Sequence, residues 1–131
     1  VIDGFTIKGG NANGNGSISY QSATYNNSIG GGIYNYASAP TVTNTTFLYN
    51  TAVNGGGMVN VSSSSPIITN TTFLYNTAEI GGGGMYNYDA SSPIITNTTF
   101  LYNTADGHGG GMSNGSSSSP TITNTTFSYN T

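Results

Sequence analysis

Short stretches of this chain alternate between apolar and polar residues, and the alternation restarts at a regular interval. The stretch PIITNTTFLYNTA (Pro66–Ala78) is one example, with Pro before the alternating residues and Asn within them. Alternation with a period of two is typical of a β-strand, and Pro, Gly and Asn favour the turns that bound it. We therefore expect Ile68, Thr71 and Phe73 to point into an interior. The chain would turn a corner near Asn70.

The same stretch recurs along most of the chain. It appears twice as PIITNTTFLYNTA, once as PTVTNTTFLYNTA and once as PTITNTTFSYNT, with its proline at a nearly constant interval (Pro40, Pro66, Pro93 and Pro120). A block of glycines precedes each copy. A divergent copy, VIDGFTIKGGNA, opens the chain, with Ile2 matching Val42 and Ile7 matching Phe47. Such regular repetition indicates a stacked repeat architecture rather than a globular domain.

One repeat, about 26–27 residues, is too long for a single strand and fits one coil of two or three short strands. Each coil would stack on the next at about 4.8 Å, so that like residues form ladders of Phe, Ile and Asn. The expected fold is all-β, a parallel β-solenoid of about five coils. It forms one domain over residues 1–131, with a divergent first strand region at 1–12, an insertion loop at 13–29 and regular repeats at 30–131. The two Asn ladders would comprise Asn50, Asn76, Asn103 and Asn130, and Asn35, Asn60, Asn87 and Asn114.

Several of these elements resemble a known family. GGGIYN, SSPIITNTTFLYNTA, GGGMYN and the opening VIDGFTI are similar to the right-handed parallel β-helix repeats of large bacterial and archaeal surface proteins, such as the polymorphic outer-membrane proteins. The resemblance implies a right-handed helix and a place on the cell surface or outside the cell. This chain departs from that family where Cys is common, because it has Thr there (Thr45, Thr71, Thr98 and Thr125).

Composition excludes some functions. Only 4% of the residues are charged, with a single Lys, no Arg and a net charge of -3. A nucleic-acid binder needs a basic patch to neutralise phosphates, so we expect no nucleic-acid partner. No apolar run approaches the roughly 20 residues of a membrane-spanning helix, so this segment should not insert into a membrane. The chain has no Cys, so neither a disulfide framework nor a thiolate zinc site is expected. It opens on Val without a signal peptide, which favours a mature or excised piece, and its scarcity of Lys and Glu favours an extracellular surface.

Right-handed β-helices also occur as polysaccharide lyases and hydrolases, so an enzyme is one alternative. Such chemistry needs paired carboxylates, or acids that hold calcium beside a basic residue. Glu79 and Asp106 are the only suggestive pair, each just after a Thr-Ala dipeptide and one coil apart, and His108 follows Asp106. We expect this pair to lie in an exposed turn, as a weak candidate cation site at most. The prediction is a non-enzyme with no catalytic residues and no cofactor.

The structural hypothesis is that the chain builds an extracellular filament or surface stalk. Its first and last strands share one register and neither end shows a recognisable polar cap, so solenoid edges would be open there. The expected partner is the same chain, as a head-to-tail homopolymer or a continuation of the solenoid. The expected self-assembly edges are Val1, Ile2, Phe5, Ile7, Ile122, Thr125, Phe127 and Tyr129.

Three surface properties remain open alternatives or additions. Asn-x-Thr sequons predict glycosylation at Asn44, Asn70, Asn97 and Asn124, and sequons also occur at Asn15, Asn26, Asn60 and Asn114. Outward columns of Thr would suit an ice-binding face (Thr43, Thr69, Thr96 and Thr123, and Thr46, Thr72, Thr99 and Thr126). A Tyr ladder could stack on sugars in an adhesin-like glycan-binding or host-binding module (Tyr49, Tyr75, Tyr102 and Tyr129).

Overall fold

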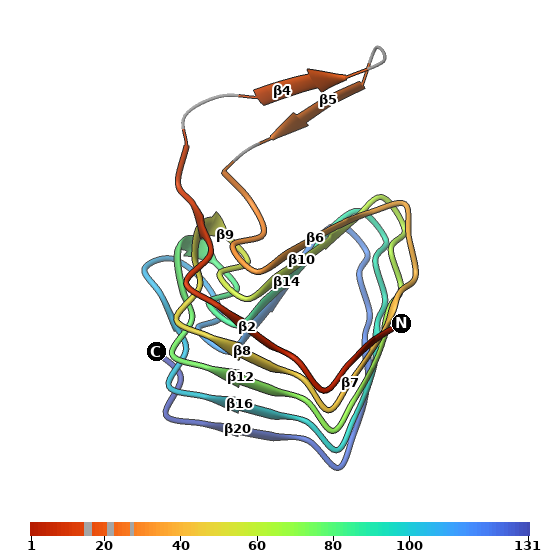
Figure 1. Ribbon diagram of the computed structural model, residues 1–131, viewed down its shortest axis with the longest axis vertical. Coiled ribbons are helices and arrows are strands. Elements are labelled where there is room, and N and C mark those ends of the chain that lie inside the picture. The colour runs from red at the N-terminus through yellow and green to blue at the C-terminus, as the bar shows by residue number, and fades with distance from the viewer. Residues whose placement is uncertain (15–16, 21–22, 27) are drawn as a thin grey trace.

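The computed structural model describes residues 1–14, 17–20, 23–26 and 28–131. In these residues the regular structure is entirely β, wound into one rising coil whose successive turns lie above one another (Figure 1). The first turn contains β1 (Ile2–Asp3), β2 (Thr6–Lys8), β3 (Asn11–Ala12) and β6 (Ile33–Tyr36). The later strands are β7 (Thr41–Thr43), β8 (Thr46–Leu48), β9 (Thr51–Asn54), β10 (Met58–Val61), β11 (Ile67–Thr69), β12 (Thr72–Leu74), β13 (Thr77–Gly81), β14 (Met85–Asn87), β15 (Ile94–Thr96), β16 (Thr99–Leu101), β17 (Thr104–Ala105), β18 (Met112–Asn114), β19 (Thr121–Thr123) and β20 (Thr126–Ser128).

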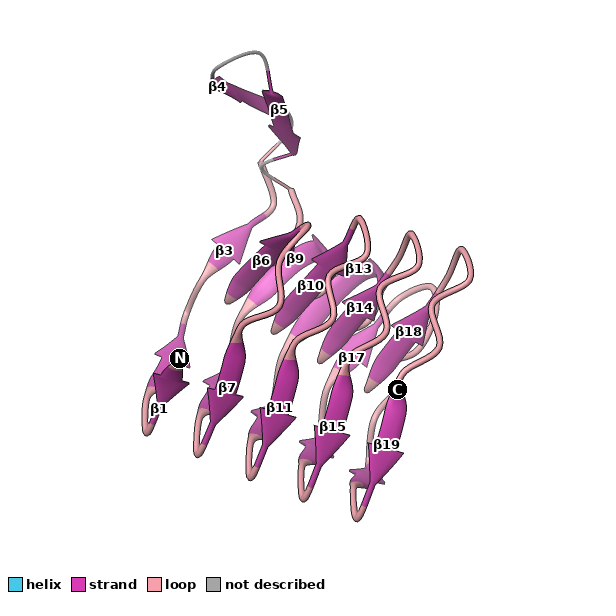
Figure 2. Cartoon of the chain, turned by 90° about the vertical axis from the view of Figure 1, so that its right-hand side faces the viewer, coloured by secondary structure: helices cyan, strands magenta, loops and turns pink. Residues whose placement is uncertain are grey.

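Four parallel sheets form the sides of the coil. Their strand orders are β1-β7-β11-β15-β19, β2-β8-β12-β16-β20, β3-β9-β13-β17 and β6-β10-β14-β18. Figure 2 shows the strands of successive turns standing side by side. The fold is therefore the expected parallel β-solenoid, with about four turns where about five coils were expected, because the last turn contributes only β19 and β20.

The pairing register confirms the alignment of the divergent first copy. Ile2 pairs with Val42, Ile7 with Phe47, and Ala12 with Ala52. The predicted insertion at 13–29 contains β4 (Ser17–Tyr20) and β5 (Ala23–Asn26), an antiparallel pair that stands away from the first turn (Figure 1). The coil resumes one residue earlier than predicted, since Ile29 already bridges to Asn54. The sequon residue Asn15 lies outside the described residues.

The interior consists of stacked identical side chains. Phe73 lies between Phe47 and Phe100, with ring centroids 4.6 Å apart on both sides and nearly parallel planes. Ile68 and Phe73 are fully buried, and Thr71 is 1% exposed, as the alternation predicted. The buried Thr71 hydroxyl donates to the carbonyl oxygen of Thr69 at 3.0 Å, so its polar group has a partner inside the apolar core.

Corners are made by residues with left-handed backbone conformations. Asn70 and Tyr75 have φ of 51° and 53°, and the equivalent Asn and Tyr of the other regular coils adopt similar values. The predicted corner at Asn70 is confirmed; Asn suits it because its short polar side chain tolerates this region. At another corner, Gly84 packs so closely that an added Cβ would lie 2.5 Å from the carbonyl oxygen of Gly111. Only glycine allows the coils to approach there.

Buried Asn ladders connect each coil to the next. Asn76 Nδ2 donates to the Phe47 carbonyl of the preceding coil at 3.0 Å and to Asn103 Oδ1 of the following coil at 2.9 Å. The second ladder runs from Asn35 through Asn60 and Asn87 to Asn114, each step a 2.8 Å amide hydrogen bond. Both predicted ladders are confirmed, and they satisfy polar groups that would otherwise be costly to bury.

Candidate assembly interface

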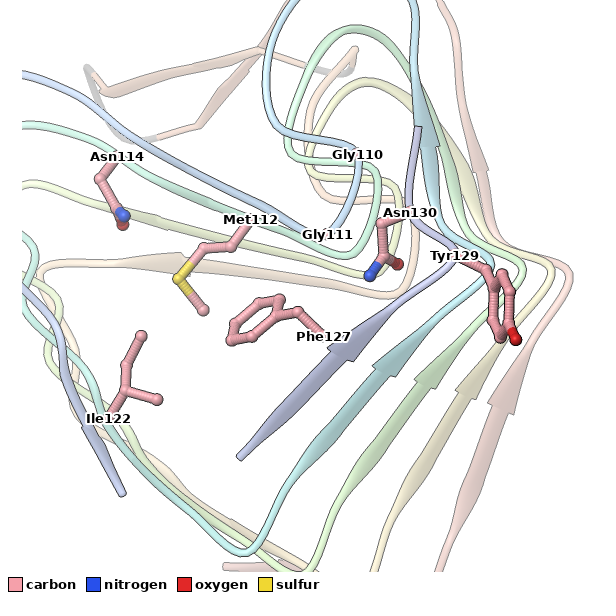
Figure 3. Close-up of a pocket in the computed structure, with 8 residues that line it drawn as sticks. All are labelled: Gly110, Gly111, Met112, Asn114, Ile122, Phe127, Tyr129 and Asn130. Atoms are coloured by element: carbon pink, nitrogen blue, oxygen red, sulfur yellow. The ribbon is translucent and has the colours of Figure 1, made fainter. Parts of the chain in front are cut away.

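At the C-terminal face of the coil Ile122 and Phe127 are 43% and 44% exposed, although their equivalents in the middle turns are fully buried. A hollow of about 430 Å³ opens there, lined by Gly110, Gly111, Met112, Asn114, Ile122, Phe127, Tyr129 and Asn130 (Figure 3). Phe127 stacks on Phe100 at 4.6 Å on one side, yet it is 44% exposed because no ring covers its other side. This face therefore has the shape and the side chains of a solenoid interior that is open on one side.

The last strand also has backbone groups available for pairing. The Thr126 N–H donates to Thr98 at 3.0 Å, and the Ser128 carbonyl accepts from the Tyr102 N–H at 3.2 Å. Because residues of a parallel strand alternate between their two neighbours, the N–H and C=O of Phe127 point toward the open edge. The edge strand β20 can therefore pair with a further parallel strand.

The opposite face differs in chemistry. Val1 is 94% exposed and Phe5 62%, while Ile2 and Ile7 are partly buried against the core. The first coil also contributes two charged side chains, Asp3 and Lys8. Asp3 Oδ1 accepts a 2.9 Å hydrogen bond from Asn44 Nδ2, and Lys8 Nζ lies 5.8 Å from the ring centre of Tyr49. These two charges therefore lie against the first members of the outer Asn and Tyr ladders, Asn44 and Tyr49.

The predicted edge residues fall on the two end faces, with Thr125 between β19 and β20. Sequence reasoning did not predict that the four sheets of the coil end at different heights. Two sheets have five strands and two have four, so the C-terminal face is one strand higher on the β19 and β20 sides than on the β17 and β18 sides. The sequence does contain a signal for this difference in height. The first and last strands share one register, so the chain makes a whole number of turns and then adds two further strands.

The carboxylate pair lies where the sequence placed it. Gly81 of β13 bridges to His108, and Asp106 N–H donates to the Ala78 carbonyl at 3.2 Å, so Glu79 and Asp106 occupy equivalent positions one coil apart. Glu79, Asp106 and His108 are all exposed. Among the described residues no group of three or more His, Asp or Glu side chains gathers in a way that could hold a metal ion.

The structure separates the sequons by exposure. Asn44, Asn70, Asn97 and Asn124 lie on an exposed outer corner, where Asn70 Nδ2 donates to Asn44 Oδ1 at 3.3 Å. Asn60 is fully buried in an inner ladder. Glycosylation of the outer four therefore stays a prediction, whereas the folded chain offers no access to Asn60.

The Tyr ladder has less binding surface than its sequence suggests. The rings of Tyr49, Tyr75, Tyr102 and Tyr129 stack on one another with centroids 5.0–5.2 Å apart. A sugar stacks on the face of an aromatic ring, and both faces of Tyr75 and Tyr102 are covered by neighbouring rings. Tyr129, which is 71% exposed, has the one face left open at the C-terminal end of this ladder.

In a second pair of tyrosines, Tyr86 and Tyr88, the pKa of one side chain is shifted. The rings of Tyr86 and Tyr88 are 5.8 Å apart and nearly parallel. Burial raises the pKa of Tyr86 above its usual value of 10.0, and the charge of a nearby Tyr88 phenolate adds to the effect. The shift follows from the packing of the Tyr86 ring beside Tyr88.

The outer Thr columns are partly covered and lie beside a column that contains Ile. Thr69 and Thr96 are only partly exposed, and the neighbouring outward column contains Ile67 and Ile94, which are 47% and 48% exposed. The face is thus a mixed Thr and Ile surface rather than a uniform array of hydroxyls. Ice binding stays an untested alternative.

The geometry defines a parallel β-solenoid. Comparison with protein families agrees: the model of the right-handed beta helix region matches residues 2–131. The chain belongs to this family, which confirms the right-handed β-helix, and its closeness to the polymorphic outer-membrane repeats stays a resemblance. Searches of curated proteins and of solved structures found no match to the chain. Among the described residues, no helix is long and apolar enough to cross a lipid bilayer.

Proposed function

We propose that this chain is a non-catalytic structural element, a stiff segment of an extracellular filament or cell-surface stalk built by stacking of β-solenoid coils. The observation that carries the proposal is that every regular coil makes the same contacts with the next. Phe47, Phe73, Phe100 and Phe127 repeat one stacking distance of 4.6 Å. A catalytic site needs unlike groups gathered at one place, whereas this chain repeats like groups at every level.

The inner Asn ladders make the stack stiff as well as long. An Asn inside the buried ladder joins three consecutive coils, as Asn76 does by bonding to the coil before it and to the coil after it. Bending the rod would stretch these buried amide bonds, which have no water to replace them. A chain in which 4% of the residues are charged also offers little electrostatic repulsion between neighbouring rods or coils.

Family membership alone does not separate a structural role from an enzymatic one. The adhesin-like alternative needs an outer surface that can hold a ligand. The stacked Tyr rings cover most of one another's faces, so few ring faces are left to contact a ligand. The repeats that carry Glu79 and Asp106 contain no Lys or Arg. These features support a structural role over both alternatives.

Immunoelectron microscopy of the cells that produce the chain tests the proposal. Antibodies against the folded chain should label filaments or stalks outside the cell. A matched antibody raised against the unfolded chain controls for cross-reaction, since the Phe and Ile side chains that fill the interior of the folded coil are exposed only on unfolding. Label confined to the cell interior would overturn the proposal. Release of reducing ends from a polysaccharide, abolished by Glu79→Gln, would establish the enzyme instead.

A further inference from the structure

We propose that one outer corner of the coil is a covalent attachment site for sugars, and that these sugars keep neighbouring rods apart. The acceptors are the side-chain amides of the exposed sequon residues Asn44, Asn70, Asn97 and Asn124. The inference rests on the proposed extracellular structural function and adds to it a modification and a purpose. The group attached is a sugar joined through its anomeric carbon.

The fold places both required side chains of the sequon on the outside of the coil. Asn70 is exposed, with a φ of 51°, at the corner between β11 and β12, and this corner points away from the coil (Figure 1). Thr71 points inward and is 1% exposed, whereas Thr72 is partly exposed. N-linked modification needs an Asn and a hydroxyl two residues later on an accessible surface. The folded coil meets this requirement, and Asn97 repeats it with a φ of 50°.

The outer amides can take a sugar without losing their ladder bonds. An Asn Nδ2 carries two hydrogens. Asn97 Nδ2 donates to Asn70 Oδ1, and Asn70 Nδ2 donates to Asn44 Oδ1, each at 3.3 Å. A glycosylated amide nitrogen keeps one hydrogen, so a sugar on Asn70 replaces the second hydrogen and the bond to Asn44 remains. Modification is therefore compatible with the outer ladder.

The sequon at Asn60 is the opposite case. Asn60 is fully buried, its Nδ2 donates to Asn87 Oδ1 at 2.8 Å, and its Oδ1 accepts from Asn35 at 2.8 Å. A sugar on Asn60 would have to lie inside a close-packed interior, so a chain modified there could not form this coil. The folded protein should therefore carry sugar on the outer corner and none on Asn60, whether the sugar is attached before or after folding.

The covalent step is a glycosyl transfer from a sugar that carries a phosphate or diphosphate leaving group. The Asn Nδ2 attacks the anomeric carbon, so a C–N bond forms while the C–O bond to the phosphate breaks. The nitrogen gives up one proton to a base, and the phosphate leaves with the electron pair of the broken bond. This chain is only the acceptor, and a transferase of the producing cell supplies the sugar donor and the base.

The sheet beside the corner indicates what the sugars do. Ile67 and Ile94 come three residues before Asn70 and Asn97, and they are 47% and 48% exposed. The strands on both sides of the corner in the middle coils, β7, β8, β11, β12, β15 and β16, contain no charged residue. Exposed Ile on an uncharged face promotes association between molecules. Hydrated sugars along the corner would hold such faces apart, and they would not obstruct stacking along the coil axis.

Peptide mapping of the protein purified from the cells that produce it tests the attachment. The protease should cleave after aromatic residues, because the chain has a single Lys and no Arg. The peptide DASSPIITNTTF then reports on Asn97, and the peptide ending in SSSSPIITNTTF reports on Asn70. We expect sugar on both residues and none on Asn60. Unmodified Asn at both positions, or sugar on Asn60, would overturn the proposal.

Two substitutions at one position separate the sequon from the fold. In the same cells, Thr72→Ala should abolish the sugar on Asn70 and leave the sugar on Asn97. Thr72→Ser keeps a hydroxyl and should retain both sugars. Thr72 points outward and is only partly covered, so both variants should give the circular dichroism spectrum of the original chain. Sugar on Asn70 in Thr72→Ala would show attachment without the sequon and would count against the proposal.

Removing the hydroxyl from all four outer sequons tests the purpose of the sugars. Ala at Thr46, Thr72, Thr99 and Thr126 should increase light scattering severalfold, and Ser at the same positions should not. Adding Ile67→Lys to the Ala variant should restore dispersal, because the new charges repel one another. Ile80→Lys is the control, at an Ile of β13 that is 52% exposed, and it should not restore dispersal.

Unchanged scattering of the Ala variant, or equal rescue by Ile80→Lys, would refute the role of the sugars in keeping rods apart. The structural function is tested separately, because immunoelectron microscopy can find filaments whether or not the chain carries sugar. Labelled filaments of an unmodified chain would overturn the sugar site and leave the structural function standing.

Discussion

Asn103 Oδ1 accepts two hydrogen bonds from Asn76, one from its backbone N–H at 3.0 Å and one from its side-chain amide at 2.9 Å. Asn76 Oδ1 receives the same two bonds from Asn50, at 3.0 and 2.9 Å. Each carbonyl oxygen of the ladder thus uses both of its lone pairs inside the protein. The ladder is a chain of mutually dependent buried bonds, and removing one member leaves several groups without partners.

Asn76→Ala should therefore destabilise the fold by about 3 kcal/mol or more, because buried donors of Asn50 and the Phe47 carbonyl lose their partner at about 1–3 kcal/mol each. Asn70→Gly is the matched control on the outer corner. It removes an exposed 3.3 Å bond and keeps a residue suited to the positive φ, so the change should stay within about 1 kcal/mol. Urea unfolding followed by circular dichroism measures both, and similar losses would contradict a special role for the inner ladder.

Phe73→Ala should cost about 3–5 kcal/mol, the range for truncating a fully buried Phe, since it removes a ring stacked on both sides. Tyr75→Ala, in the same coil, removes a ring that is also stacked on both sides but is 41% exposed. Its loss should be about 1 kcal/mol, the value of an aromatic pair beyond burial. Chemical denaturation of the two variants in parallel checks the difference, and a larger loss for Tyr75→Ala would be inconsistent with a Phe-filled core.

Gly84→Ala should destabilise the protein by about 2 kcal/mol or more, the cost of forcing extra volume into a packed interior. The added Cβ would lie 2.5 Å from Gly111 O and 2.8 Å from Phe100 Cδ1, both in closely packed surroundings. Gly81→Ala is the control within the same glycine block, because the nearest atom to its Cβ is 3.3 Å away. Thermal unfolding of both variants should show a clear loss only for Gly84→Ala.

The free energy of unfolding should fall in alkaline solution as the Tyr86 side chain loses its proton. Its pKa is raised in the folded state, so the folded chain holds this proton more tightly than the unfolded chain. The contribution is fully present below the unfolded value of about 10 and is lost as the pH rises through the folded pKa. Unfolding free energies measured between pH 8 and 11 should decline less for Tyr86→Phe than for the original chain. Tyr88→Phe, which removes the smaller cause, should give an intermediate slope.

Much of the fold follows from local pattern. The alternation around Phe73, the corner at Asn70 and the Asn ladders could all be predicted, because each coil repeats one environment and stacking can place only like residues together. The end chemistry could not be predicted in this way. Lys8 and Asp3 are isolated charges in the sequence, and only the pairing of β1 and β2 with the second coil brings them to Tyr49 and Asn44.

The sequence by itself determined the repeat, the parallel stacking and the identity of the buried residues, because a nearly constant period leaves one way to bury Ile and Phe in every copy. The tertiary structure decided the chemistry of the two end faces. It set Gly10 against the Gly31 carbonyl, where no side chain fits, and it left Asn130 and Phe127 facing an open hollow. These contacts depend on the level along the coil axis at which each sheet ends. That level is set by the folded coil and cannot be read from any single repeat.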